Sequence, residues 1–205
     1  MARPATLPDL LRPSLDIVFV GINPSLYSVA AGHYFARRTN RFWPAFSRSA
    51  LSREARAALG VETLLPQYDR ALVEYGFGFT DTVKRASARA EEVPKDEFAK
   101  AAPLLVRKLE RFRPRIACFH GVTSYRPLAR ALDPAAGNAP LGLQSLRIGD
   151  TLLFVVPNPS PANAHFTLAD QIAWYDRLDA LRRAVDQAEP SGSGTSSSAG
   201  MAAKR

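Results

Sequence analysis

The chain has 205 residues, 46% of them hydrophobic, which is enough for one domain of ordinary size with a buried core. Its single cysteine, Cys118, excludes an internal disulfide and a cysteine-rich metal or cluster site. The net charge of +8 favours a polyanionic partner. No apolar run approaches the roughly 20 residues that span a bilayer, and the N-terminus leads into no long apolar core. We therefore expect neither a membrane segment nor a signal peptide.

Short apolar runs that stop at glycine or proline predict strands at residues 16–20, 115–119, 144–148 and 151–156. Gly149-Asp150 is a hairpin signal between the last two. Residues 76–81 form a glycine-rich extended segment, and residues 85–92 form a polar loop. Apolar residues at helical spacing predict helices over residues 41–51, 53–59, 67–75, 94–112, 122–132 and 167–187. Thr167 and Asp170 suit a capping box at the start of the last helix.

The two ends of the chain differ from the middle. Residues 2–15 are punctuated by proline, with one helical turn expected around residues 9–11. Residues 191–205 are rich in serine, glycine and alanine, which is typical of disorder. We expect one domain over residues 1–188 and a disordered tail over residues 189–205.

The alternation of strands and helices predicts an α/β fold with a mainly parallel sheet between helices. In open sheets of this kind, ligands bind beyond the carboxyl ends of the strands. Asn23-Pro24 and Asn158-Pro159 each follow such a strand. Two Asn-Pro turns at two strand ends are therefore expected to face one pocket.

These turns resemble the motifs of a known family. The segment GINPS at residues 21–25, with Phe35-Ala36 and TNRFW at residues 39–43, is similar to the first motif of the mismatch-specific uracil-DNA and thymine-DNA glycosylases. NPS at residues 158–160 resembles their second motif. NPSP at residues 158–161 also resembles the His-Pro-Ser-Pro motif of the broader uracil-DNA glycosylase superfamily. The resemblance implies a three-layer α/β/α sandwich with a mainly parallel central sheet.

Asn23 has two interpretations. A lone Asn at a strand end is typically a turn residue that bonds its own backbone. The resemblance instead assigns Asn23 to positioning the water that attacks the sugar C1′. A neutral amide can orient water through its acceptor and donors, but it is not a strong base.

The resemblance also implies a pocket for the flipped base. Phe35 would stack on the base, a contact that contributes about 1–3 kcal/mol. The backbone of Ile22 and Ser25 would read its polar edge, although the family usually has glycine where this chain has Ser25. Asn158 would bond the pyrimidine, and its alternative is a simple turn residue.

Contacts to DNA are expected around the same motifs. By resemblance, Ser160 holds a phosphate, and the loop of Pro161, Ala162 and Asn163 enters the minor groove. Family members often carry a large apolar wedge followed by arginine here, where this chain has small residues. His165 has no predicted role. Phosphate contacts are expected for some of the basic residues that flank the pocket segments, namely Arg37, Arg38, Arg41, Lys84, Arg85 and Arg89.

Asp81 ends the glycine-rich segment. It is either a turn or cap residue, or a carboxylate that activates the water and stabilises the oxocarbenium-like sugar. The resemblance does not assign it.

Together these features predict a monofunctional DNA glycosylase that removes uracil, preferably from G:U mismatches. Its partner is duplex DNA containing uracil or a mismatch, and we expect a monomer without cofactor, cytoplasmic in a bacterium or nuclear in a eukaryote. Neither Asn-Pro motif contains lysine, so we expect no Schiff base and no strand cleavage. The alternatives are a non-catalytic binder of DNA damage and a nucleotide-binding enzyme of the doubly wound type.

Overall fold

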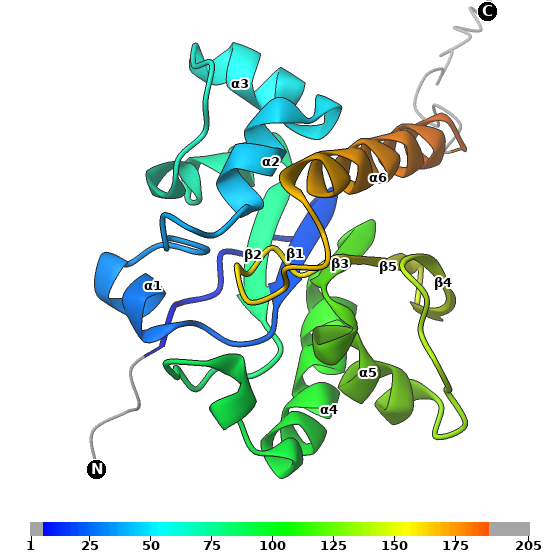
Figure 1. Ribbon diagram of the computed structural model, residues 1–205. Coiled ribbons are helices and arrows are strands. Elements are labelled where there is room, and N and C mark those ends of the chain that lie inside the picture. The colour runs from blue at the N-terminus through cyan, green and yellow to red at the C-terminus, as the bar shows by residue number, and fades with distance from the viewer. Residues whose placement is uncertain (1–5, 189–205) are drawn as a thin grey trace, which may run out of the picture.

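One sheet of five strands forms the centre of the molecule (Figure 1). The computed structural model describes residues 6–188, and the tail predicted over residues 189–205 lies outside them. The strands are β1 (Ile17–Gly21), β2 (Phe77–Asp81), β3 (Ile116–His120), β4 (Gly142–Ile148) and β5 (Thr151–Val156). Their order is β2-β1-β3-β5-β4, and every neighbouring pair is parallel except β4 with β5.

Helices cover both faces of the sheet. The α-helices of residues 6–188 are α1 (Leu26–Ala31), α2 (Phe42–Arg48), α3 (Arg53–Leu59), α4 (Lys95–Phe112), α5 (Val122–Leu132) and α6 (Leu168–Ala188). Helices α2 and α6 lie on one side of the sheet, and α4 and α5 lie on the other (Figure 1). The predicted three-layer α/β/α sandwich with a mainly parallel sheet is confirmed.

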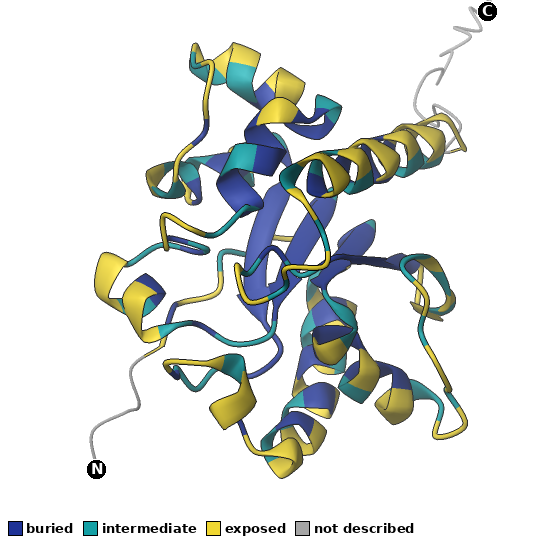
Figure 2. Cartoon of the chain, viewed as in Figure 1, coloured by how far each residue is buried: buried dark blue, intermediate teal, exposed yellow. Residues whose placement is uncertain are grey.

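The alternation of side chains along the strands explains why their sequences are continuously apolar. In β1, Ile17 and Phe19 pack into the cluster under α2 and α6, whereas Val18 and Val20 pack into the cluster under α4 and α5. Every residue of β1, β2 and β3 is buried, as expected for parallel strands covered on both faces (Figure 2). The edge strand β4 instead alternates between exposed and partly buried positions over most of its length.

The helix predicted over residues 67–75 is wrong. Two short 3₁₀ segments, Pro66–Tyr68 and Ala71–Tyr75, lie there instead. Between them Asp69 is buried, and its carboxylate accepts the Tyr34 N–H at 3.0 Å and contacts His33 Nδ1 at 3.1 Å. This tie to a distant loop accompanies the break between the two 3₁₀ segments.

The helical turn predicted around residues 9–11 is also wrong. Leu10 pairs with Phe79 through two backbone hydrogen bonds of 2.9 Å, which covers part of the free edge of β2. The approach requires Gly78, because a Cβ there would lie 2.8 Å from the Leu10 carbonyl oxygen. The glycine-rich segment of residues 76–81 therefore contains a buried strand, and Gly78 allows the backbone of Leu10 to approach it.

Candidate active site

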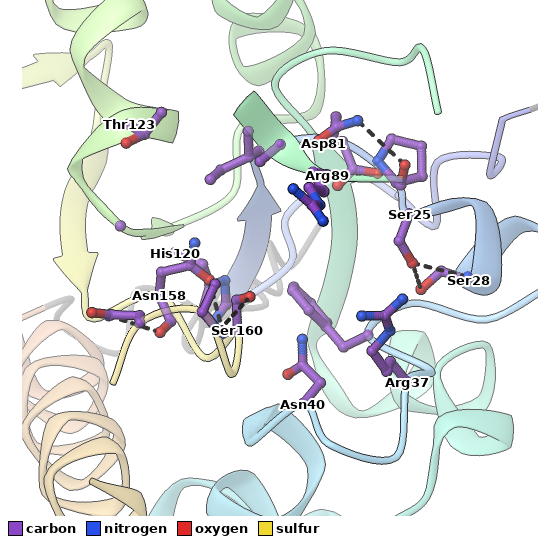
Figure 3. Close-up of a pocket in the computed structure, with 18 of the residues that line it drawn as sticks. Ser25, Ser28, Arg37, Asn40, Asp81, Arg89, His120, Thr123, Asn158 and Ser160 are labelled. Carbon is purple, nitrogen blue, oxygen red and sulfur yellow. Dashed lines mark hydrogen bonds between the residues drawn. The ribbon is translucent and has the colours of Figure 1, made fainter. Parts of the chain in front are cut away.

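A cavity of about 820 Å³ opens at the carboxyl ends of the parallel strands (Figure 3). Asp81 ends β2, His120 ends β3, and Ile22 follows β1, so this is the edge at which open parallel sheets bind ligands. The cavity is lined by the candidate residues Ile22, Asn23, Ser25, Phe35, Arg37, Asp81, Asn158, Ser160, Pro161, Ala162 and Asn163, and by Arg89. Of the other basic candidates, Arg38, Arg41, Lys84 and Arg85 do not line it.

Asn23 is fixed by its amide nitrogen. Nδ2 donates to the Ser87 hydroxyl at 2.8 Å, to the Arg85 carbonyl at 3.0 Å and to the Pro24 carbonyl at 3.3 Å. Oδ1 accepts no hydrogen bond from residues 6–188, which differs from the turn in which an Asn oxygen binds its own backbone. The unengaged end of this cavity-lining amide is thus an acceptor, which can orient a water molecule.

Asp81 is a buried carboxylate without a hydrogen-bond donor in the described part of the chain. It is 4% exposed, and its Oδ2 atom is fully buried and unbonded. The register places Asp81 directly beside Gly21, and a Cβ at residue 21 would lie only 2.4 Å from Oδ1. A turn or cap carboxylate accepts backbone N–H bonds, and Asp81 accepts none. Gly21 thus makes room for a carboxylate with no role in holding the local backbone.

The surroundings of Asp81 shift its protonation. Burial raises the pKa of Asp81 to about 7, because the ionised form loses its hydration, and the nearby Lys84 opposes this rise. Lys84 Nζ lies 4.0 Å from Asp81 Oδ2 and 2.9 Å from an oxygen of Asp9. Because Lys84 is shared with Asp9, it compensates Asp81 only in part. A carboxyl group that titrates near neutral pH is suited to take up a proton during a reaction.

Phe35 lies at the border between the core and the cavity. Its ring stacks on Phe42 with a centroid distance of 4.3 Å and an interplanar angle of 15°, and the His120 ring lies 5.0 Å away. The ring is partly buried and packs on the core, and it also lines the cavity. The backbone of Phe35 has a φ of 52°, which is strained for a bulky residue. The loop therefore holds this ring in place at a cost in backbone energy.

Asn158 is fixed in the opposite sense to Asn23. Its Oδ1 accepts the Ser160 N–H at 3.0 Å, so it is a turn residue, as one of the two interpretations held. Its Nδ2 donates to no atom of residues 6–188. A donor that is free at the cavity wall can bind a carbonyl oxygen of a ligand.

Ser25 and Ile22 contribute differently from each other. The Ser25 hydroxyl caps helix α1, which the sequence did not predict, by accepting the Ser28 N–H at 3.0 Å and donating to Ser28 Oγ at 3.0 Å. The Ile22 side chain packs against Val83, Val93 and Phe98. These side chains serve the fold, which leaves backbone atoms for contact with a ligand.

The model of the Uracil DNA glycosylase superfamily matches residues 8–182, which is most of the chain. The chain belongs to the uracil DNA glycosylase superfamily. The match places it in the superfamily as a whole and does not separate out the mismatch-specific branch. The fold is also similar to the solution NMR structure of a proposed uracil DNA glycosylase from Methanosarcina acetivorans. That likeness has a TM-score of 0.52 at 20% identity and covers 88% of this chain and 97% of the other.

Membership of the superfamily indicates a DNA glycosylase, so the basic residues near the cavity are candidates for contacts with DNA. Arg37 and Arg89 line the cavity. Arg85 instead pairs with Glu97 at 2.8 Å. The guanidinium of Arg41 donates to four carbonyls of the second glycosylase motif and its loop, those of Pro159, Ser160, Asn163 and Phe166. Arg41 therefore anchors the loop predicted to enter DNA and is not free for phosphate.

His120 lines the cavity but was not singled out from the sequence. It is 1% exposed, and its Nε2 lies 2.9 Å from the Tyr175 hydroxyl of α6. Burial lowers the pKa of His120 to about 3, so the ring is neutral and forms an uncharged wall beside Phe35. The available signal was its position, because His120-Gly121 ends a third parallel strand at the same edge.

Neither a metal site nor a membrane segment is found in the part that the structure describes. No group of three or more His, Cys, Asp or Glu residues among residues 6–188 is placed to hold a metal ion. No helix in that range is long and apolar enough to cross a bilayer.

Proposed function

We propose that this protein removes uracil from duplex DNA, preferably from G:U mismatches, by hydrolysing the N-glycosidic bond. The observation that carries the proposal is the meeting of Asn23, Asp81 and Asn158 at one cavity, in a chain of the uracil DNA glycosylase superfamily. A stacked base cannot reach such a cavity, so the nucleotide is flipped out of the duplex.

The base lies against the ring of Phe35, whose other neighbour is Phe42. Stacking on such a ring contributes about 1–3 kcal/mol. Uracil presents carbonyl oxygens on its polar edge, and the free Nδ2 of Asn158 is a donor suited to one of them. Backbone groups of Ile22 and Ser25 complete the contact with the base.

Asn23 orients the attacking water through Oδ1, and Asp81 takes up the proton that the attack on C1′ releases. The negative charge of Asp81 also stabilises the positive charge that develops on the sugar, as carboxylates do in other sugar-cleaving enzymes. The products are the free base and an abasic site. No lysine among residues 6–188 lines the cavity, so these residues offer no amine for a Schiff base and strand cleavage.

Contacts with the DNA backbone come from Arg37 and from the Ser160 hydroxyl, while Pro161, Ala162 and Asn163 enter the minor groove. The small side chains at residues 162 and 163 make a weak wedge, and flipping is easiest for a base that is already poorly paired. This favours a mismatched substrate. We propose that one protomer is sufficient for activity, since the candidate residues come from a single chain.

The test is base release from labelled duplexes that contain G:U, A:U, G:T or normal pairs, with hypoxanthine and xanthine included. We expect free uracil and alkali-labile sites, fastest for G:U, and no strand cleavage before alkali is added. A protein that binds the G:U duplex but releases no base from any duplex would be a binder of DNA damage, and the proposal would be wrong.

A further inference from the structure

The amide of Asn23 is held by a segment that lies more than 60 residues away in the sequence. Its Nδ2 donates to the Arg85 carbonyl at 3.0 Å and to the Ser87 hydroxyl at 2.8 Å. A carbonyl oxygen only accepts hydrogen bonds, so the nitrogen end of the amide must face it. The contacts with this segment therefore determine which end of the Asn23 amide is left for the cavity.

The Ser87 hydroxyl uses its own proton in a hydrogen bond to another residue. It is 5% exposed, and its Oγ donates to the Arg89 carbonyl at 2.6 Å. Because its proton is used there, the hydroxyl can only accept from Asn23. The hydrogen bonds run in one direction, from Asn23 to Ser87 to Arg89.

The segment is also fixed to the first motif through its backbone. The Ser87 N–H donates to the Pro24 carbonyl at 3.2 Å, and the Leu26 N–H donates to the Ser87 carbonyl at 3.1 Å. A rotation of the Asn23 amide by half a turn would bring Oδ1 against the Arg85 carbonyl, and two acceptors would then face each other. The Arg85 carbonyl and the Ser87 hydroxyl therefore both disfavour the orientation in which Oδ1 faces them.

We propose that Ser87 is a positioning residue that keeps the Asn23 oxygen available as the acceptor for the attacking water. The inference rests on the proposed function of Asn23, and Ser87 acts only through that amide. Loss of the Ser87 hydroxyl would remove the shortest of the three Nδ2 contacts. The amide would then be held only by the Arg85 carbonyl at 3.0 Å and the Pro24 carbonyl at 3.3 Å, so its orientation would be less tightly fixed.

The test is Ser87→Ala in single-turnover cleavage of a G:U duplex. Loss of one buried hydrogen bond corresponds to a fall in rate of about tenfold, with duplex affinity little changed. In an Asn23→Ala background, the same substitution should have no further effect, because no amide remains to be oriented. An unchanged rate for the single variant, or an equal loss in both backgrounds, would overturn the inference.

Ser47→Ala is a matched control. Ser47 is also 5% exposed, donates to the Leu64 carbonyl at 3.2 Å and accepts the Leu64 N–H at 2.8 Å, and it does not line the cavity. It should leave the cleavage rate unchanged even though it removes a similar buried hydroxyl. An equal fall in rate for Ser47→Ala would show that the effect of Ser87→Ala comes from stability alone.

A second measurement does not depend on activity. In the NMR spectrum of the unmodified full chain, the side-chain N–H pair of Asn23 should exchange slowly with solvent, and Ser87→Ala should speed that exchange. Fast exchange in the unmodified chain would contradict the inference. If the unmodified chain releases no uracil but Asn23 shows slow exchange, the proposed function fails while the orientation of the amide stands.

Discussion

The two Asn-Pro turns place the same residue type at the same cavity with opposite hydrogen-bonding polarity. Asn23 uses its nitrogen to bind Ser87 and Arg85 and keeps its oxygen free. Asn158 uses its oxygen to bind Ser160 and keeps its nitrogen free. One turn therefore offers an acceptor, which suits water, and the other offers donors, which suit a carbonyl of the base.

The hydrogen-bond partners of a side chain, and not its residue type alone, thus decide which of its groups remain available in a site. Asp81 is a third case, because its carboxylate accepts no hydrogen bond from residues 6–188. A buried carboxylate that accepts no hydrogen bond, and whose charge Lys84 compensates only in part at 4.0 Å, destabilises the folded protein when it is ionised. Its place at the cavity therefore suits the proposed reaction and does not stabilise the fold.

Removal of the free acceptor at residue 23 should slow cleavage more than any other single change. Asn23→Ala should lower the single-turnover rate on a G:U duplex by roughly 10²–10³, as does loss of a positioned polar group in other active sites. Binding of the duplex should persist, because the base still meets Phe35 and Asn158. A variant that cleaves at nearly the normal rate would break the proposed contrast between the two turns.

Asp81→Asn should lower the rate at pH 8 by roughly 10², because the proton acceptor is lost while the shape is kept. In the unmodified protein the rate should fall as the pH drops through about 7, the value to which burial raises the pKa of Asp81. A pH–rate profile of both proteins checks this. Normal cleavage by the variant would leave the chemistry to Asn23 alone.

Asp81→Asn should stabilise the folded protein at alkaline pH, although it lowers the cleavage rate. Burial raises the pKa of Asp81 in the folded state above 3.8, so ionisation of Asp81 lowers the free energy of unfolding. This destabilisation is absent below about pH 4, grows between about pH 4 and pH 7, and is complete above about pH 7. Asp81→Asn should therefore raise the melting temperature at pH 8 and change it little at pH 4. A lower melting temperature at pH 8 would support a structural role.

Ala162→Leu should narrow the difference between the rates on G:U and A:U duplexes, by a few-fold. A larger wedge in the loop after Asn158 helps to extrude a well-paired base, whose flipping costs a few kcal/mol. Single-turnover rates on the two duplexes measure the effect. Equal rates on both duplexes for the unmodified protein would contradict the proposed weak wedge.

The smallest effect is expected for Arg37→Gln at the rim. If Arg37 contacts a phosphate, the slope of log affinity against log salt should decrease in magnitude by about 1, with the base preference unchanged. Arg41→Gln should instead disturb the loop that carries Asn158, because Arg41 binds only backbone carbonyls there. An unchanged slope for Arg37→Gln would show that its charge is incidental.

Much of the fold was predictable because the information is local. The apolar run before Asn23 predicts β1, and helix α5 and α3 begin and end at the predicted residues. The Thr167–Asp170 capping box is present, with hydrogen bonds of 2.7–3.1 Å. The meeting of the two Asn-Pro turns at one cavity also followed from a general rule about parallel sheets.

What the sequence did not predict depends on contacts between distant segments. The tie of Asp69 to residues 33 and 34 interrupts a region with helical spacing, and the pairing of Leu10 with β2 replaces a helical turn. In the site, the commitment of Arg41 to backbone carbonyls and the hold of Ser87 on Asn23 join residues more than 60 positions apart. The sequence next to each residue gives no sign of these distant partners.

Asn158→Asp separates the role of Asn158 in the turn from its contact with the base. Aspartate keeps the oxygen that accepts the Ser160 N–H and removes the free donors. Uracil release from a G:U duplex by the unmodified protein and by Asn158→Asp should be measured beside their melting temperatures. We expect release by the unmodified protein, a rate roughly 10²-fold lower for the variant, and nearly equal melting temperatures. Equal rates of release would show that Asn158 is only a turn residue, and no release by the unmodified protein would contradict the glycosylase assignment of the cavity itself.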